Sequence, residues 1–175
     1  MVYAEQEQPI LLINATNHWL TSFPDQPNET AAAFDFRGRA WTQLETYDLA
    51  VRNFTKSLEI KENNAVRERR AFANYRLENW QAVIDDADLI LGSDPDRQRA
   101  EFVRAMALGL DQQYELALTA TAQLLDESRT QPLDEQDTAF LKKQVETWKQ
   151  LGPQPRVRAP RLLFLPSAVL YRLIS

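Results

Sequence analysis

Histidine and cysteine, side chains often used as catalytic base and nucleophile, are nearly absent from this sequence. His18 is the only histidine, so a Ser-His-Asp arrangement would have to be built around that one residue. Cysteine is absent from the sequence, which excludes disulfides, thiolate metal sites and cysteine nucleophiles. A glycine-rich phosphate loop, an HExxH pattern and a nucleophile with a base beside it are absent from the sequence as well. We therefore expect a protein that is not an enzyme and that needs no cofactor or metal.

Asp85, Asp86 and Asp88 are the group of side chains that comes nearest to a cation site. In a helix, carboxylates separated by one, two and three positions cannot all converge on one face. We expect these three aspartates to lie on a solvated convex surface.

Arginine is the residue type most suited here to binding a partner. Arg37, Arg70 and Arg104 recur at one position of a repeated pattern. We expect them to form a ladder of pairs with acids such as Asp48 or Glu78. A second group of basic residues could hold an acidic partner, and its members are Arg39, Arg69, Arg70 and Arg76.

Net charge and the distribution of apolar residues narrow the class of protein further. The net charge is -5, whereas a general nucleic-acid binder needs a basic face. No uninterrupted apolar stretch reaches the length that a membrane-spanning helix requires, so we expect no conventional membrane span. The first residues include Glu5 and Glu7 but no basic segment, so we expect no signal peptide and a cytoplasmic location.

Three blocks of sequence that align on one another define the elements that position these residues. Their large aromatic residues are Tyr47, Trp80 and Tyr114, which follow one another at a nearly constant interval. Each block also has a small residue before its aromatic residue: Gly38, Ala71 and Ala105. The interval is about 34 residues, a period typical of stacked helical hairpins. We expect the small residues to let the two helices of a hairpin approach closely, and the aromatic rings to fill the space between neighbouring hairpins.

Apolar periodicity and helix-end signals predict an all-α fold. The expected helices cover residues 9–23, 31–44, 47–60, 66–77, 80–91, 98–110, 114–126 and 134–151. Thr30 is the expected N-cap of the second helix, and Trp148 is expected to pack as part of a closing helix. The expected divisions are an N-terminal helix and linker at 1–30, three repeats at 31–130, a capping helix at 131–152 and a tail at 153–175.

The repeats resemble tetratricopeptide repeats (TPRs) over residues 31 to about 130. The first repeat matches the family pattern at Gly38, Trp41, Tyr47, Ala50, Phe54 and Ser57. The second matches at Ala71, Trp80, Val83 and Pro95, and the third at Ala105, Leu108, Tyr114 and Ala117. Asn74 and Arg129 depart from the pattern. The resemblance implies a right-handed α-solenoid in which the first helix of each hairpin lines a concave, peptide-binding groove.

The resemblance also implies which residues would contact a partner. The candidate groove residues are Arg39, Phe72, Tyr75, Arg76, Arg99, Phe102 and Met106. The family's carboxylate clamp, which grips an acidic C-terminal peptide of chaperones, corresponds here to Asp35, Arg39, Arg69, Arg99 and Val103. Only Arg99 keeps the charge of a clamp lysine, and Asp35 would repel a carboxylate, so we do not expect this clamp.

The tail at 153–175 differs in composition from the rest of the chain. It has four arginines and no acid, so its charge is +4, which leaves -9 on the rest for a net charge of -5. Its expected contact residues are Arg156, Arg158, Arg161, Leu163, Phe164, Leu170 and Tyr171. Because its prolines prevent a long amphipathic helix, we favour a protein over an anionic membrane surface as the target.

Two functions remain open from the sequence. The first is a TPR adaptor or assembly factor that binds a partner peptide in its groove and uses the tail as a second contact. The second is a structural protein whose basic tail docks on the acidic body, in its own groove or in that of a neighbouring copy, which would give a homo-oligomer. In the second case the chain's own ends cover the groove.

Overall fold

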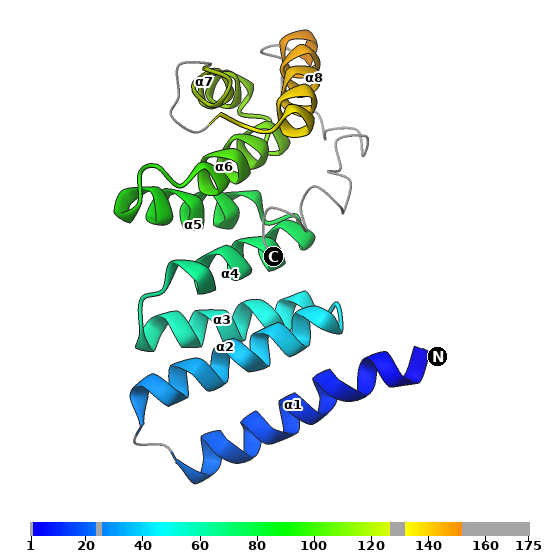
Figure 1. Ribbon diagram of the computed structural model, residues 1–175, viewed down its shortest axis with the longest axis vertical. Helices are drawn as coiled ribbons and strands as arrows, with labels where there is room; N and C mark the ends of the chain where they lie inside the picture. Colours follow the sequence, from blue (N-terminus) through cyan, green and yellow to red (C-terminus); the bar gives the residue numbers. More distant parts are fainter. Residues whose placement is uncertain (1, 24–25, 127–131, 152–175) are drawn as a thin grey trace. The chain divides into compact units, whose positions relative to one another are not determined.

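The computed structural model describes residues 2–23, 26–126 and 132–151, with side chains described from Glu7 onward. Within these ranges the chain forms eight α-helices and no strand (Figure 1). In chain order they are α1 (Val2–Ser22), α2 (Pro27–Gln43), α3 (Tyr47–Ile60), α4 (Asn64–Arg76), α5 (Trp80–Ser93), α6 (Gln98–Leu110), α7 (Tyr114–Leu124) and α8 (Glu135–Leu151). The predicted all-α fold is therefore confirmed.

The helices pack as neighbouring pairs within two compact units. Unit 1 spans Met1–Asn79 and unit 2 spans Trp80–Ser175. In unit 1, α2 packs against α1 and α3, and α3 packs against α4. In unit 2, α6 packs against α5 and α7, and α7 packs against α8. Each helix thus buries its apolar face mainly against the helices next to it in sequence.

Three helices begin at the aromatic residues of the repeats. Tyr47, Trp80 and Tyr114 are the first residues of α3, α5 and α7, as predicted. Tyr47 is buried and lies edge-on to Phe72 of α4, with the two ring centroids 6.2 Å apart. This ring therefore fills space between α3 and the next helix, as expected. Trp80 and Tyr114 are only half-buried, which is less than the sequence predicts for them.

The turn before each of these aromatic residues has one backbone geometry. The residue after the helix C-cap is left-handed at Glu45, Glu78 and Gln112, with φ of 55°, 59° and 64°. The next N–H donates back across the last helical turn, from Thr46 to Trp41 at 2.9 Å, from Asn79 to Asn74 at 2.9 Å and from Gln113 to Leu108 at 2.8 Å. This pattern is the Schellman motif, which satisfies carbonyl groups that the helix end leaves unpaired. The repeat is therefore present in the backbone as well as in the side chains.

Three helices begin earlier than the sequence predicts, α4 by two residues and α1 and α2 by more. α1 extends upstream of Pro9 to Val2, and Pro9 is buried inside the helix. α2 begins at Pro27, which makes Gln26 the N-cap and places Thr30 within the first turns. Proline fits the start of a helix because its missing N–H has no intrahelical partner there. The predicted N-cap at Thr30 is therefore wrong.

Close contact between helices depends on one glycine in each unit. A Cβ atom on Gly38 of α2 would lie 2.6 Å from a ring carbon of Phe54 in α3, and Phe54 is 1% exposed. A Cβ atom on Gly109 of α6 would lie 2.2 Å from a ring carbon of Trp148 in α8. Trp148 is 1% exposed, which confirms that this residue packs in the core.

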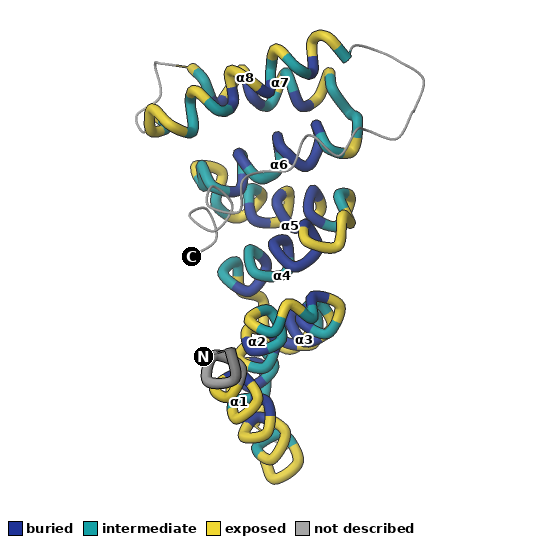
Figure 2. Tube along the Cα trace, turned by 90° about the vertical axis from the view of Figure 1, so that its right-hand side faces the viewer, coloured by how far each residue is buried: buried dark blue, intermediate teal, exposed yellow. Residues whose placement is uncertain are grey.

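The helices differ in how much of their surface is buried (Figure 2). α6 is buried along most of its length, at Ala100, Phe102, Ala105, Met106, Ala107, Leu108 and Gly109. α1 instead exposes apolar side chains, with Ile10 at 47% and Leu11 at 63%. None of the described helices is long and apolar enough to cross a membrane.

Candidate functional site

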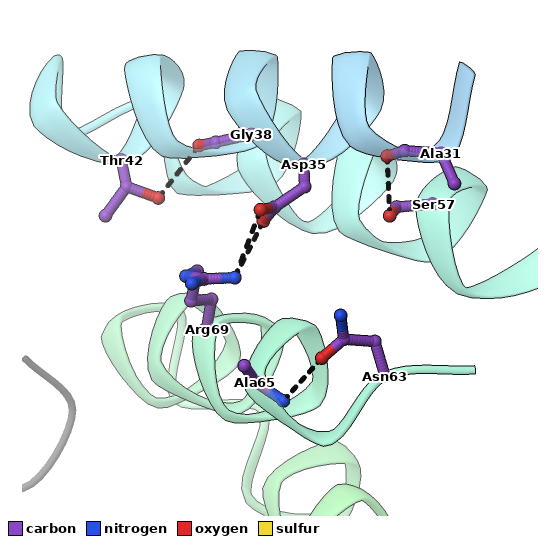
Figure 3. Close-up of polar contacts among 8 residues, drawn as sticks. All are labelled: Ala31, Asp35, Gly38, Thr42, Ser57, Asn63, Ala65 and Arg69. Carbon is purple, nitrogen blue, oxygen red and sulfur yellow. Dashed lines mark hydrogen bonds and ion pairs between the residues drawn. The ribbon is translucent and has the colours of Figure 1, made fainter. Parts of the chain in front are cut away.

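Helices α2 and α4, the first helices of two predicted repeats, are linked by a charged pair (Figure 3). Arg69 Nη1 donates to both carboxylate oxygens of Asp35, at 3.0 and 3.1 Å. The Asp35 side chain is 16% exposed, and burial raises its pKa although the positive charges of Arg69 and Arg39 lower it. The guanidinium therefore compensates only part of the cost of burying the carboxylate.

Two arginines of unit 1 are exposed and held against aromatic rings. The guanidinium carbon of Arg39 lies 5.5 Å from the centroid of the Phe36 ring, and that of Arg76 lies 4.5 Å from the centroid of the Tyr47 ring. Neither Arg39 nor Arg76 forms an ion pair with a residue that the structure describes. A guanidinium group that rests on a ring keeps its N–H edges available for a carboxylate.

The predicted apolar residues of unit 1 are buried. Phe72 is 8% exposed and packs edge-on against Tyr47, and Tyr75 is 5% exposed. The repeat position places these residues on the side of α4 expected to face a partner. Their rings contribute instead to packing, so the exposed part of the predicted set in unit 1 is Arg39 and Arg76.

The predicted residues of unit 2 are more deeply buried than those of unit 1. Phe102 is fully buried, and its ring stacks on Phe140 of α8 with centroids 6.3 Å apart. Met106 is 1% exposed, whereas Arg99 is half-buried. A helix of the chain itself therefore covers the Phe102 position. The predicted tail contacts, from Arg156 to Tyr171, lie outside the described residues.

Two of the clamp positions lie close together in unit 1. These residues, Asp35 and Arg69, are bound to each other. The carboxylate that Arg69 holds is thus one from the chain itself.

Of the three arginines of the predicted ladder, Arg104 pairs with an acid, Asp88 of α5, but none of the three pairs with Asp48 or Glu78. Each arginine donates to a polar side chain of the preceding helix: Arg37 to Asn17 of α1, Arg70 to Thr55 of α3 and Arg104 to Asp88 of α5. Asp48 and Glu78 are exposed, at the first turn of α3 and in the turn after α4. Their positions at helix ends put them away from the face that packs on the preceding helix, so pairing with them was a wrong prediction.

The aspartates of α5 also differ from their prediction. Asp85 and Asp88 are exposed, but Asp86 is 1% exposed, so the three do not share a solvated surface. Asp86 lies on the same side of α5 as the buried Val83 and Ile90. Among the described residues, no group of three acids or histidines is placed to hold a metal ion.

Unit 1 has an open pocket that the sequence did not indicate. It measures about 660 Å³ and lies among α1, α2 and α3. Its lining residues are Ile13, Asn17, Arg37, Trp41, Leu49, Val51, Arg52, Asn53, Thr55, Lys56 and Glu59. Arg52 and Lys56, one helical turn apart on α3, were the only sequence signal for it, and the contribution of α1 lies outside the repeat pattern.

Comparisons of the chain with protein-family models, with curated proteins and with solved structures give no match. Its function therefore has to follow from the side chains and contacts of the two units.

Proposed function

We propose that the chain is a non-catalytic protein-protein interaction module, a TPR-like adaptor or assembly factor that acts in the cytoplasm. Its helix pairs stack as a right-handed α-solenoid, and the first helices of the pairs bind a partner peptide. The regular recurrence of the aromatic residues and the matching left-handed turns at Glu45, Glu78 and Gln112 support this arrangement.

The exposed Arg39 and Arg76 on their aromatic rings are the observation that carries this function. A guanidinium group that already rests on a ring loses little side-chain freedom when a ligand arrives. Its N–H edges bind carboxylates through paired hydrogen bonds. The partner segment is therefore acidic, and Arg99 provides a further contact in unit 2.

The buried residues of the predicted set act as support for this surface. Phe72 packs on Tyr47, and the Tyr47 ring in turn carries the guanidinium of Arg76. In unit 2, Phe102 and Met106 hold α6 in place beneath half-buried residues such as Arg99. The contacts with the partner are therefore mainly polar, and the apolar residues fix the arginines in position.

Photo-crosslinking in cells tests this function. A photoreactive residue replaces Phe36, which is 44% exposed and lies beside Arg39, and in a control it replaces Leu116, which is 53% exposed on α7. We expect a specific crosslinked protein from position 36 that is lost in Arg39→Gln/Arg76→Gln. The same products from both positions, or products that persist in the double variant, contradict the proposal.

Self-association through the tail is the second candidate function, favoured by the charge of +4 on the tail against -9 on the rest of the chain. Light scattering on the full chain and on a chain ending at residue 152 tests it. An oligomer that dissolves on truncation supports self-association. If the full-length chain is a monomer, the tail of one copy does not dock on a neighbouring copy.

A further inference from the structure

The pocket among α1, α2 and α3 of unit 1 brings together three basic side chains and one acid. The basic residues are Arg37, Arg52 and Lys56, and the acid is Glu59. None of the three basic groups forms an ion pair with a residue that the structure describes. Elsewhere in unit 1, Arg69 and Arg67 do have carboxylate partners, in Asp35 and Glu62. The pocket is therefore a local concentration of uncompensated positive charge.

Two of these positive charges share one aromatic ring. The guanidinium carbon of Arg37 lies 5.0 Å from the centroid of Phe34, and the Lys56 ammonium lies 5.4 Å from the same centroid. The ring attracts each cation, but the two cations repel each other. An anion bound between them would relieve this repulsion.

Arg37 is also fixed in orientation by neutral groups. Its Nε donates to Asn53 Oδ1 at 2.7 Å, and its Nη1 donates to Asn17 Oδ1. Asn53 is held in turn, because its Nδ2 donates to the Leu49 carbonyl at 2.7 Å. Burial lowers the pKa of Arg37, since the guanidinium loses water without gaining a carboxylate. The structure thus maintains a partly desolvated cation in a preset orientation.

The rest of the pocket wall is apolar. Ile13 of α1, Trp41 of α2, and Leu49 and Val51 of α3 line it together with the basic residues. A ligand that fills the pocket therefore carries an apolar group beside its negative charge.

We propose that this pocket is a second binding site, for an acidic segment of a protein partner in which a Glu or Asp side chain is adjacent to an apolar side chain. The carboxylate binds between Arg37, Arg52 and Lys56, and the apolar side chain packs on Ile13 and Trp41. The site is separate from the Arg39 and Arg76 surface and does not depend on it. No side chain of the tail supplies such a carboxylate, because its charged side chains are all arginines.

A short peptide fits the charge of the molecule better than a nucleic acid does. The pocket gathers three basic side chains and one acid, whereas the chain as a whole carries a net charge of -5. The net negative charge of the chain disfavours a long polyanion, whereas a single acidic side chain with its neighbour would contact mainly the pocket.

Fluorescence anisotropy on the full chain tests the site. The probe is a fluorescein-labelled peptide of repeated Leu-Glu-Glu units, and its control is the same peptide with Gln in place of every Glu. The pocket variant is Arg52→Gln/Lys56→Gln, which changes two exposed residues without touching the hydrogen bonds of Arg37. The matched variant is Lys142→Gln/Lys143→Gln, which removes the same charge from two exposed residues of α8 in unit 2.

We expect the Glu peptide to bind and the Gln peptide not to bind. The pocket variant should weaken binding about tenfold or more, and the matched variant less than about twofold. Failure of the Glu peptide to bind, or an equal loss in both variants, overturns the proposal. Displacement of the peptide by equimolar inorganic phosphate assigns the pocket to a free anion and overturns it as well. Arg39→Gln/Arg76→Gln removes any binding of the probe at the surface on α2 and α4, and in that background Arg52→Gln/Lys56→Gln should still weaken binding about tenfold or more. A pocket variant that has no effect in that background overturns the proposal and leaves the Arg39 and Arg76 surface untouched.

Discussion

Gly38 leaves space for the Phe54 ring, and that space decides how close α2 and α3 can come. A methyl group added at Gly38 would lie 2.6 and 2.7 Å from two ring carbons of Phe54. Phe54 is 1% exposed and cannot turn aside without moving its neighbours. We expect Gly38→Ala to lower the unfolding free energy by about 1–3 kcal/mol, as overpacked cores do. Urea unfolding of the two proteins measures it.

Gly92 near the end of α5 is the control for this change. Apart from its chain neighbours and the nearby backbone of α5 itself, no atom lies within 4 Å of a Cβ built on Gly92, so Gly92→Ala creates no clash. Alanine is the better helix former, and we expect a gain of about 0.5–1 kcal/mol. A stabilising effect of Gly38→Ala would show that α2 and α3 pack less closely than the structure places them.

The free energy of unfolding should depend on pH through Asp35, and the direction of its pKa shift determines whether stability rises or falls with pH. Its pKa is raised above the ordinary value of 3.8 by burial, so folding favours the protonated carboxyl group. The stabilisation from a raised pKa is fully present below the unfolded-state value and is lost as pH rises through the folded-state value. We expect the unfolding free energy of the wild type relative to Asp35→Asn to be greatest at acid pH and to fall toward neutral pH.

Urea unfolding of the wild type and Asp35→Asn over the acid-to-neutral range measures this difference. Titration of the other carboxyl groups is common to both proteins and cancels. A difference that grows with pH would mean that the charge of Arg69 outweighs burial and holds the pKa of Asp35 below 3.8.

At the scale of the element, the three Schellman turns lack the glycine that such turns usually contain. Glu45, Glu78 and Gln112 each have a left-handed backbone, which costs a residue with a Cβ atom about 1–2 kcal/mol. Glycine adopts this backbone without that cost. We expect Glu45→Gly to be more stable than Glu45→Ala by about 1 kcal/mol, the reverse of the order inside a helix. Thermal unfolding of both variants measures which one is more stable. A higher melting temperature for Glu45→Ala than for Glu45→Gly would show that the turn is not left-handed in solution.

The beginnings of α3, α5 and α7 could be predicted from the sequence, whereas the beginning of α2 could not. The three aromatic residues recur at a nearly constant interval and mark one place in each repeat. At α2 two signals competed, since Thr30 is a good N-cap and Pro27 a good first residue, and the proline prevailed. When two helix-start signals are of similar strength, the sequence alone does not show which one is used, because the choice depends on how the helix packs on its neighbours.

At the scale of the whole chain, the sequence identified the helix on which a candidate residue lies but not what covers it. Phe72 and Phe102 are on the predicted helices, yet Tyr47 packs on the first and Phe140 of α8 on the second. The pocket of unit 1 was missed for a related reason, because α1 supplies part of its wall and lies outside the repeat. Repeat position specifies a side of a helix, and only the tertiary structure shows which neighbour lies against that side.

α8 closes unit 2 by placing one large side chain over one glycine. Trp148 is 1% exposed. Its ring is so close to Gly109 that a Cβ atom added there would lie 2.2 Å from a ring carbon. Replacement of Trp148 by alanine leaves a cavity, and we expect a loss of about 3–5 kcal/mol in unfolding free energy. Trp80→Ala, at a half-buried position of the same unit, should cost less.

The contact between Gly109 and Trp148 can be separated from burial by a double variant. Gly109→Ala alone should destabilise unit 2, because its methyl group collides with the ring. In a Trp148→Ala background the ring is gone, so the same change should be neutral or stabilising, since alanine favours the helix. Urea unfolding of the four proteins gives the coupling between the two residues. Equal effects of Gly109→Ala in both backgrounds would show that α8 does not lie on α6 at this position.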